Sequence, residues 1–312
     1  METAFKTNFK SFYEMLELLP NDNACRLFLE DLRWAGKPVC PHCGSINENH
    51  YKLKTKGEFT GLYKCKDCRE RFTVTVGTMF EGSHVPLRKW FIAIYIFTSH
   101  KKGISSIQLG KDLGITQKSA WFVLHRLRNT FEQPQQKFDG ITEIDESWMG
   151  GADKNKHANK KTGVSGAHTK TAVLGIRNRK DGIVKAQVVP NTKAETLVPI
   201  IKQEVIADSI VMTDENRAYV KLHEHFSHGT VNHSAKEYVN GQFHTNGIEN
   251  FWSHLKRGID GIYHQCSTKH LQSYVNEFSF RYNSRKTSES ARFIFSLQRA
   301  EKRLTYKELI NN

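Results

Sequence analysis

The spacing of apolar side chains changes near residue 138 of this 312-residue chain. Before that point, apolar residues recur every three or four positions, which is the pattern of amphipathic helices. After it, short apolar runs alternate with polar residues and are separated by turns that contain glycine, which is the pattern of strands. The sequence therefore predicts a first part built mainly of helices and a second part of mixed α/β structure.

Two segments of the first part carry the helical pattern. Residues 1–36 form a helical segment that Pro20 divides into two short helices. Residues 84–132 form the second segment, in which one helix begins after Pro86 and two further helices meet at Gly114. Three helices with a tight turn between the last two are typical of a helix-turn-helix DNA-binding domain.

The third helix of residues 84–132 carries candidate DNA-binding side chains. Gln117, Lys118 and Ser119 at its start would face the major groove. Arg126 and Arg128 near its end would face phosphates. A plain three-helix bundle without DNA binding is the alternative, because helical hairpins with a glycine turn are common.

The second part is expected to contain a sheet. Strands are predicted over residues 141–148, 171–176, 183–189 and 210–213, with a helix over residues 193–205 before the last strand. This is the opening element order of a ribonuclease-H-like, retroviral-integrase-like α/β fold, in which the first and fourth strands lie adjacent and parallel. Asp145 on the first strand would then meet Asp214 at the end of the fourth.

A further helix is predicted over residues 246–257. Its buried side is expected to carry Ile248, Trp252 and Leu255. Glu249 lies at the margin of this apolar stripe, and 34 residues separate it from Asp214. A third acid is therefore placed on a helix that follows the two strand acids.

The charge of the chain indicates the kind of partner. There are 46 Lys and Arg against 32 Asp and Glu, and the net charge of +14 is spread along the whole length. Such a field favours polyanions, most often nucleic acid, although a basic protein without such a partner is the alternative. No signal peptide or membrane-length apolar run is recognised. We therefore expect a cytoplasmic, nucleoid-associated protein in a bacterium, or a nuclear one in a eukaryote, with no membrane partner.

Four of the six cysteines form two pairs with metal-ligand spacing. Cys40 and Cys43 make one C-x2-C knuckle, and Cys65 and Cys68 make a second after 21 intervening residues. Two such knuckles complete a closed tetrahedral site for one structural Zn²⁺, whereas four unrelated thiols are the alternative. The sequence predicts a zinc ribbon over residues 37–78, with short strands that include one over residues 72–76.

Asp145, Asp214 and Glu249 are an acid set suited to metal-dependent phosphoryl transfer. Phosphodiester cleavage needs charge to be stabilised on the attacking and leaving oxygens, and two divalent ions about 3.5–4 Å apart can do both. Mg²⁺ or Mn²⁺ prefers oxygen ligands, and three carboxylates suffice when water and the substrate phosphate complete the coordination. The three acids are therefore the candidate catalytic residues and ligands of a two-ion magnesium site.

Each acid also has a purely structural interpretation. Glu249 has capping-box spacing from the first residue of its helix and could satisfy the helix's own amides. Asp214 could cap a short helix that follows it. Glu143 or Glu146 could take the place of Asp145 as the strand acid.

Taken together, these features resemble a DDE transposase. They comprise the zinc ribbon, the helix-turn-helix, Asp145 followed by Gly150-Gly151, the 34-residue interval, and Lys256-Arg257 after Glu249. The combination is similar to bacterial insertion-sequence transposases with an N-terminal zinc ribbon, the group related to eukaryotic Merlin elements. The resemblance covers roughly residues 25–285.

This resemblance implies a transposase that binds the ends of its mobile element, cleaves the DNA with Mg²⁺ and transfers the freed 3′-OH to a target. The catalytic core would be residues 138–285, followed by a basic helical tail over residues 286–312. The partners would be the double-stranded DNA of terminal inverted repeats and target, with the protein a homo-oligomer on DNA.

The resemblance also bears on residues near the third acid. Lys256 stands seven positions after Glu249, where such enzymes often carry a basic DNA contact, and His254 and Arg257 would also touch DNA. Some related transposases have Asn as the third ligand, so the neighbouring Asn250 is an alternative to Glu249.

Two other functions fit part of the pattern. A non-catalytic DNA-binding regulator, derived from a domesticated element, would use only the ribbon and the helix-turn-helix; the intact acid set argues against it. A structure-specific nuclease or resolvase would share the core, but the tandem DNA-binding modules argue against it. The basic loop over residues 154–170 is either a tether or a DNA contact.

Overall fold

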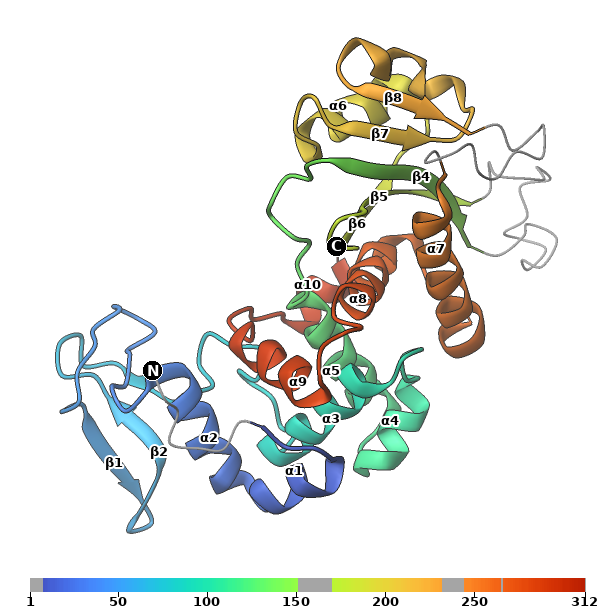
Figure 1. Cartoon of the computed structure of the whole chain (residues 1–312). Helices are drawn as coiled ribbons and strands as arrows, with labels where there is room; N and C mark the ends of the chain where they lie inside the picture. Colours follow the sequence, from blue (N-terminus) through green and yellow to red (C-terminus); the bar gives the residue numbers. More distant parts are fainter. Residues whose placement is uncertain (1–7, 151–169, 232–243, 265, 312) are drawn as a thin grey trace. The chain divides into compact units, whose positions relative to one another are not determined.

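The computed structural model of the protein describes residues 8–150, 170–231, 244–264 and 266–311. The chain divides into two compact units, one of Met1–Phe131 with Thr287–Asn312 and one of Glu132–Lys286 (Figure 1). Apart from Lys170, the basic loop of residues 154–170 lies outside the described residues. Within the described part of the chain, no helix combines the length and the apolar character needed to cross a membrane.

The first unit opens with the two expected short helices, α1 (Phe12–Leu18) and α2 (Asp22–Trp34). The side chain of Asn21 caps α2 by accepting a hydrogen bond from the amide of Ala24 at 2.9 Å. Cys25, a lone thiol, is buried on the inner side of α2, and burial raises its pKa to about 12. It is therefore a packing residue.

A small antiparallel sheet follows, with the order β1 (Tyr51–Thr55), β2 (Glu58–Lys64), β3 (Arg71–Phe72). Its core is aromatic: Tyr63 and Phe72 stack with ring centroids 5.5 Å apart, and Trp34 of α2 meets both rings edge-on. The expected strand over residues 72–76 is wrong beyond Phe72. The chain turns there instead, and the amide of Thr78 bonds back to the carbonyl of Thr75.

Three helices form where the spacing predicts them: α3 (Leu87–Ser99), α4 (Ser106–Leu113) and α5 (Gln117–Asn129). Ser105 caps α4 and Thr116 caps α5, each accepting from an amide three residues on. Gly114 ends α4 with a φ of 59°, a left-handed conformation that glycine adopts without strain.

Residues 287–311 return to the same unit as α9 (Glu289–Gln298) and α10 (Tyr306–Asn311). Phe293 of α9 is fully buried and lies edge-on to Phe91 of α3, with ring centroids 5.7 Å apart. The core of the first unit therefore combines segments from both ends of the described chain.

The second unit is built on a five-stranded sheet with the order β6-β5-β4-β7-β8. Its strands are β4 (Ile141–Met149), β5 (Thr171–Asn178), β6 (Val184–Val189), β7 (Ile210–Thr213) and β8 (Ser227–Thr230). β4 pairs antiparallel with β5 and parallel with β7, so the expected adjacency of the first and fourth strands is confirmed.

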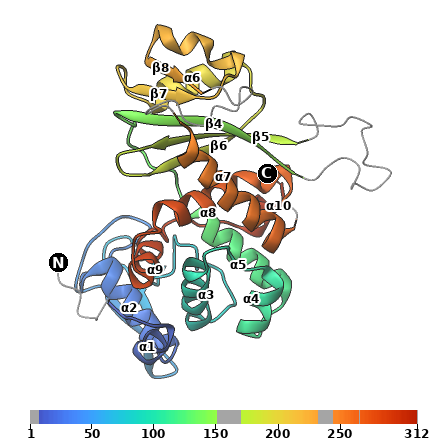
Figure 2. The ribbon, with the colours of Figure 1, turned by 45° about the vertical axis from the view of Figure 1, so that its right-hand side comes forward.

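Helices cover both faces of this sheet (Figure 2). One face packs on α6 (Ala194–Glu204) and the 3-10 helix η4 (Arg217–Glu224), and the other on α7 (Asn246–Gly258) and α8 (Leu271–Asn283). A π turn, η5 (Ile259–Tyr263), and a short 3-10 turn, η6 (Thr268–His270), link these last two helices. Along β5, Leu174 faces the first layer and Val173 the second, as strand alternation requires.

Candidate active site and zinc centre

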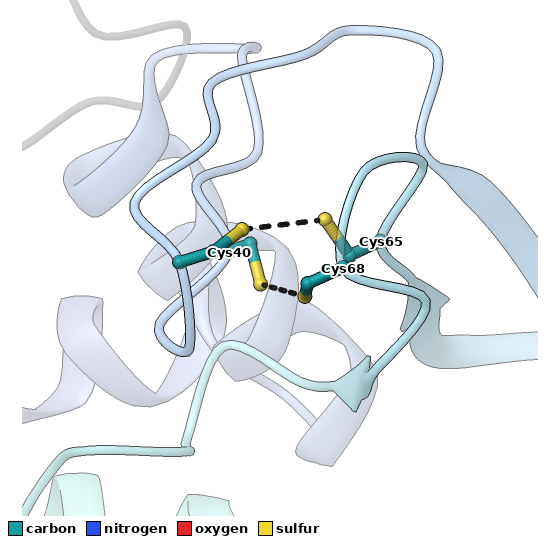
Figure 3. Close-up of side chains that lie close together, drawn as sticks. Cys40, Cys65 and Cys68 are labelled. Atoms are coloured by element: carbon teal, nitrogen blue, oxygen red, sulfur yellow. Dashed lines mark hydrogen bonds between the residues drawn. The ribbon is translucent and has the colours of Figure 1, made fainter.

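The four predicted zinc ligands come together in the first unit. The Sγ atoms of Cys40 and Cys68 lie 3.7 Å apart, as do those of Cys43 and Cys65, and all four lie within 4.8 Å of one another (Figure 3). Tetrahedral thiolates at about 2.3 Å from Zn²⁺ would be separated by about 3.8 Å. The spacing therefore fits a closed structural zinc site, as predicted.

In the second unit, the parallel register of β4 and β7 brings two acids to the same level. Ile141 pairs with Ile210, and Glu143 pairs with Met212. Continued by two residues, this register sets Asp145 level with Asp214, which directly follows β7. The charge of Asp214 acts on Asp145 and is one cause of its raised pKa.

Trp252 of α7 binds the first of these acids. Its indole Nε1 donates to Asp145 Oδ2 at 2.9 Å, while Oδ1 accepts from the amide of Glu146 at 2.8 Å. Gly175 pairs with Asp145 across β4 and β5, and a Cβ at Gly175 would lie 2.5 Å from the Trp252 ring. The absence of a side chain there gives the indole its path to the carboxylate.

The carboxylates around Asp145 repel one another. Burial raises the pKa of Asp145 to about 7, with further contributions from the charges of Glu146 and Asp214. Burial also raises the pKa of Glu146, against the hydrogen bond from Tyr219. A carboxylate with a raised pKa beside a second acid, as Asp145 is beside Asp214, is a pair that a hard divalent cation would stabilise.

Glu146 and Asp145 point to opposite faces of β4. Glu146 is buried on the η4 side, where Tyr219 and Asn216 donate to its two oxygens. Glu143 shares the α7 face with Asp145 but is fully buried and ion-paired with Arg177 and Arg179. Neither alternative acid combines partial exposure with the position beside Asp214 that Asp145 has.

The structural alternative for Asp214 is only partly realised. Asn216, and not Asp214, is the N-cap of η4, since its side chain accepts from the amide of Ala218 at 3.0 Å. Asp214 Oδ1 accepts from the amide of Asn216 at 3.0 Å. One oxygen of Asp214 thus shapes the turn after β7.

Glu249 is exposed in the first turn of α7 and accepts a hydrogen bond from Thr245 Oγ1 at 2.8 Å. Thr245 is the N-cap, and the expected capping box from the first helical residue is not the observed geometry. The predicted buried stripe is confirmed, with Ile248, Trp252 and Leu255 all inside. The neighbouring Asn250 is exposed as well, so the structure does not choose between these two residues.

The carboxylate oxygens of the three predicted acids do not form one tight cluster among the described residues. Among the described residues, the four cysteines are the group whose ligand atoms converge within 4.8 Å. Asp145 and Asp214 interact directly through their charges, whereas Glu249 is linked to them through α7 and Trp252. The full acid set as a metal site therefore stays a prediction.

Two of the predicted DNA contacts need correction. Arg126 is only 4% exposed, and its guanidinium donates to the carbonyls of Met79 and Leu304, each at 2.9 Å. Arg128 is 1% exposed and lies over the ring of Phe97. The second half of α5 is covered within the first unit, so these arginines do not face phosphates.

The start of α5 is more accessible. Gln117 and Lys118 are exposed, and Ser119 is half-buried. Gln117 Nε2 donates to Ser106 at 2.9 Å, and the Lys118 ammonium lies 4.9 Å from the ring centre of Tyr306. These side chains remain available to DNA, although each already has a partner in the protein.

The predicted DNA contacts on α7 are all exposed: His254, Lys256 and Arg257. Lys256 lies two helical turns after Glu249, so the two share one face. Partial burial, with the charges of Arg257 and Arg285, lowers the pKa of His254. The lowered pKa favours the neutral form of His254, which lies beside the cationic side chains of Arg257 and Arg285.

Comparison with known proteins gives this arrangement a family. Residues 137–283 match the ISXO2-like transposase domain, and residues 20–71 match a transposase zinc-ribbon domain. A protein of Halobacterium salinarum, described as an uncharacterized protein in transposable element ISH50, is 28% identical over 270 residues, covering 81% of this chain and 88% of that protein. An uncharacterized transposase-like protein of Haemophilus influenzae is 40% identical over 98 residues, covering 31% and 78% respectively.

A solved structure also shows a weak likeness. It is a chain of the simian T-cell lymphotropic virus intasome in complex with PP2A regulatory subunit B56 gamma, with a TM-score of 0.28 and 14% sequence identity, covering 61% of this chain and 64% of that one. That score is too low to define a shared fold. The two domain matches and the relatives decide the matter: the chain belongs to the insertion-sequence DDE transposases that carry an N-terminal zinc ribbon.

Proposed function

We propose that the protein is an active transposase that binds the ends of its mobile element, cleaves the DNA and transfers the freed 3′-OH to a target. The observation that carries this proposal is the alignment of Asp145 with Asp214 at the carboxyl end of β7, with α7 bound to Asp145 through Trp252. The strand order β6-β5-β4-β7-β8 supports the proposal of a ribonuclease-H-like core, since β6, β5 and β4 are antiparallel neighbours and β7 and β8 run parallel to β4.

In this proposal, Asp145, Asp214 and Glu249 hold Mg²⁺, or Mn²⁺, as two ions. Bound there, the ions would supply the positive charge that stabilises the attacking and leaving oxygens of a phosphodiester. Burial raises the pKa of Asp145 to about 7, with further contributions from the charges of Glu146 and Asp214, and the positive charge of bound ions would favour its ionised form. Trp252 keeps one oxygen of Asp145 oriented throughout.

DNA binding is assigned to separate parts of the chain. The zinc ribbon (residues 37–78) and a helix-turn-helix (residues 84–132) would hold the element ends, the latter through Gln117, Lys118 and Ser119. The catalytic domain (residues 138–285) would hold the scissile strand through His254, Lys256 and Arg257 on α7. The partners are double-stranded inverted repeats and target DNA, and the protein would act as a homo-oligomer on them.

The test uses full-length protein, a duplex that carries one element end, and a target plasmid. Asp145→Asn and Asp214→Asn should abolish Mg²⁺-dependent cleavage and joining while leaving binding to the duplex nearly unchanged. Asp139→Asn is the matched control, because that acid is exposed and paired only loosely with Lys180, at 3.8 Å. Strand transfer at the wild-type level by either site variant would sink the proposal.

A further inference from the structure

Two side chains of β4 hold α7 at points on either side of Glu249. Glu143 Oε2 accepts from the backbone amide of Ile248 at 2.9 Å, and Asp145 Oδ2 accepts from Trp252 Nε1 at 2.9 Å. The two acids are two residues apart on the strand, so they project from the same face. Because Glu249 lies between the two bonded residues, α7 cannot slide or rotate on β4 without breaking one of these contacts.

The Glu143 contact is backed by two arginines. Glu143 is fully buried, and its Oε1 faces Arg179 Nε at 2.7 Å and Arg177 Nη1 at 3.2 Å. Both arginines bind one oxygen, which leaves the other for the amide of Ile248. Arg179 also donates to the carbonyl of His244, just before α7 begins, at 2.5 Å. The ion pair therefore fixes the entry of the helix as well as its first turn.

Gly247 allows the helix to approach this cluster. A Cβ at Gly247 would lie 2.3 Å from Arg177 Nη1 and 2.6 Å from Glu143 Oε2, closer than real contacts allow. Alanine would favour the helical conformation over glycine. The glycine is therefore explained by the close contact with the ion pair and not by any need of the helix itself.

We propose that Glu143 is a positioning residue that sets α7, and with it Glu249, against Asp145 before any metal is bound. The inference rests on the proposed function, in which Glu249 is the third metal ligand. Glu143 takes no direct part in that chemistry, since its carboxylate is buried and already bound by Arg177 and Arg179. Glu143 would restrict the movement of α7, the helix that carries the exposed Glu249.

The proposal is tested on the full-length protein with Glu143→Gln and Gly247→Ala. The first variant leaves Arg177 and Arg179 without their countercharge, and the second pushes α7 away while keeping every charge and strengthening the helix. Glu277→Gln is the matched control for the first, because Glu277 is equally buried and pairs with Arg281 at 2.7 Å.

Gly261→Ala is the matched control for Gly247→Ala, because a Cβ at Gly261 would meet nothing within 4 Å. Two quantities are measured: hydrogen exchange of the α7 amides without metal, and Mn²⁺ affinity by calorimetry. Both test variants should speed exchange at residues 248–252 and weaken Mn²⁺ binding about 10- to 100-fold, as outer-shell changes do. Both controls should leave α7 exchange and Mn²⁺ affinity as in the wild type.

Unchanged exchange in α7 and unchanged Mn²⁺ affinity in Gly247→Ala would overturn the proposal. That variant decides the matter even if Glu143→Gln does not fold. A wild-type protein that binds no Mn²⁺ would count against the proposed function, while the exchange measurement needs no metal and still decides whether Glu143 and Gly247 hold the helix.

Discussion

Gly175 on β5 stands directly opposite Asp145 on β4, and the missing side chain of the glycine gives the acid its hydrogen-bond donor. The space that a Cβ would fill is taken by the ring of Trp252, whose N–H reaches the carboxylate at 2.9 Å. A strand interior normally disfavours glycine, and its presence there often marks a close approach by another group. Here the approaching group is an indole that orients the first acid of the candidate site.

Gly175→Ala should therefore disturb both stability and activity. The new Cβ would lie 2.5 Å from Trp252 and 2.8 Å from Ile248, so α7 must move away from the sheet. Overpacking of this kind costs about 1–3 kcal/mol of folding free energy. Urea unfolding and a cleavage assay check the two effects, and wild-type cleavage in a variant that is measurably less stable would show that the Trp252 contact is dispensable.

The metal-free protein should lose stability through Asp145 as the pH rises. Its folded-state pKa is raised from 3.8 to about 7, so below pH 4 both states are protonated and the residue costs nothing. Between pH 4 and 7 the unfolded state releases the proton first, and the folded state loses about 1.4 kcal/mol per pH unit relative to it. Above about pH 7 the cost is constant.

The Asp145→Asn variant should lack the fall in folding stability between pH 4 and 7. Comparing the unfolding free energies of the variant and the wild type across this pH range checks the prediction. Without metal, the variant should gain stability relative to the wild type as the pH rises from 5 to 7, and saturating Mg²⁺ should narrow the difference by stabilising the wild type alone. A stability difference that does not vary with pH would contradict the raised pKa.

Arginine and lysine substitutions should separate structural from DNA-binding charge. Arg126→Ala should lower folding stability by about 2–4 kcal/mol, because a charged donor to two buried carbonyls is lost. It should leave the salt dependence of DNA binding unchanged. Lys256→Ala, on the exposed face of α7, should instead reduce the slope of log K against log salt by about 1 with little effect on stability.

Fluorescence titrations of a labelled duplex at several salt concentrations give the slopes. A smaller slope for Arg126→Ala than for the wild type would restore the original assignment of that residue to phosphate contact. A flat salt dependence in the wild type would argue against DNA as the partner altogether.

Removal of zinc should unfold the ribbon locally. The four sulfurs converge on one point, and the aromatic cluster of Tyr63, Phe72 and Trp34 beside them is too small to stabilise the segment alone. Chelation or Cys40→Ser should release one zinc per chain and expose residues 37–78 to protease. Cys266→Ser, at a cysteine of the second unit, is the control, and full zinc content in Cys40→Ser would contradict the site.

Much of this fold follows from local rules that act on short segments. Helix boundaries could be predicted from sequence because the residue types at helix ends are characteristic. Ser105 and Thr116 are N-caps, and Gly114 ends a helix in the left-handed conformation. The spacing of the four cysteines likewise predicts that they bind one metal ion together. The adjacency of β4 and β7 was predictable because the order of strands and helix matched a known element order, and the two strands lie adjacent and parallel as expected. The edge strand β8 (Ser227–Thr230) was not predicted.

The parts that could not be predicted depend on contacts between distant segments. Arg126 looks like a solvated charge in sequence, and only the return of residues 287–311 to the first unit buries it against Leu304. From the sequence, Trp252 is predicted to be a core residue, and Glu143 is only an alternative to Asp145 as the strand acid. Their roles depend on which groups α7 and β4 bring together, although the N–H of a buried tryptophan usually has a hydrogen-bond acceptor.

The division of the chain into units has a consequence for how the protein is made. The second unit is continuous over Glu132–Lys286, whereas the first needs α9, which is synthesised after the whole of the second. At about 5–20 residues per second, a ribosome takes roughly 10 to 30 seconds to cross that interval. During that time the nascent α2 and α3 lack Phe293 and its neighbours, and their apolar faces are open to chaperones. The half assigned to recognising DNA would thus mature last, when translation of the half assigned to cutting it is already complete.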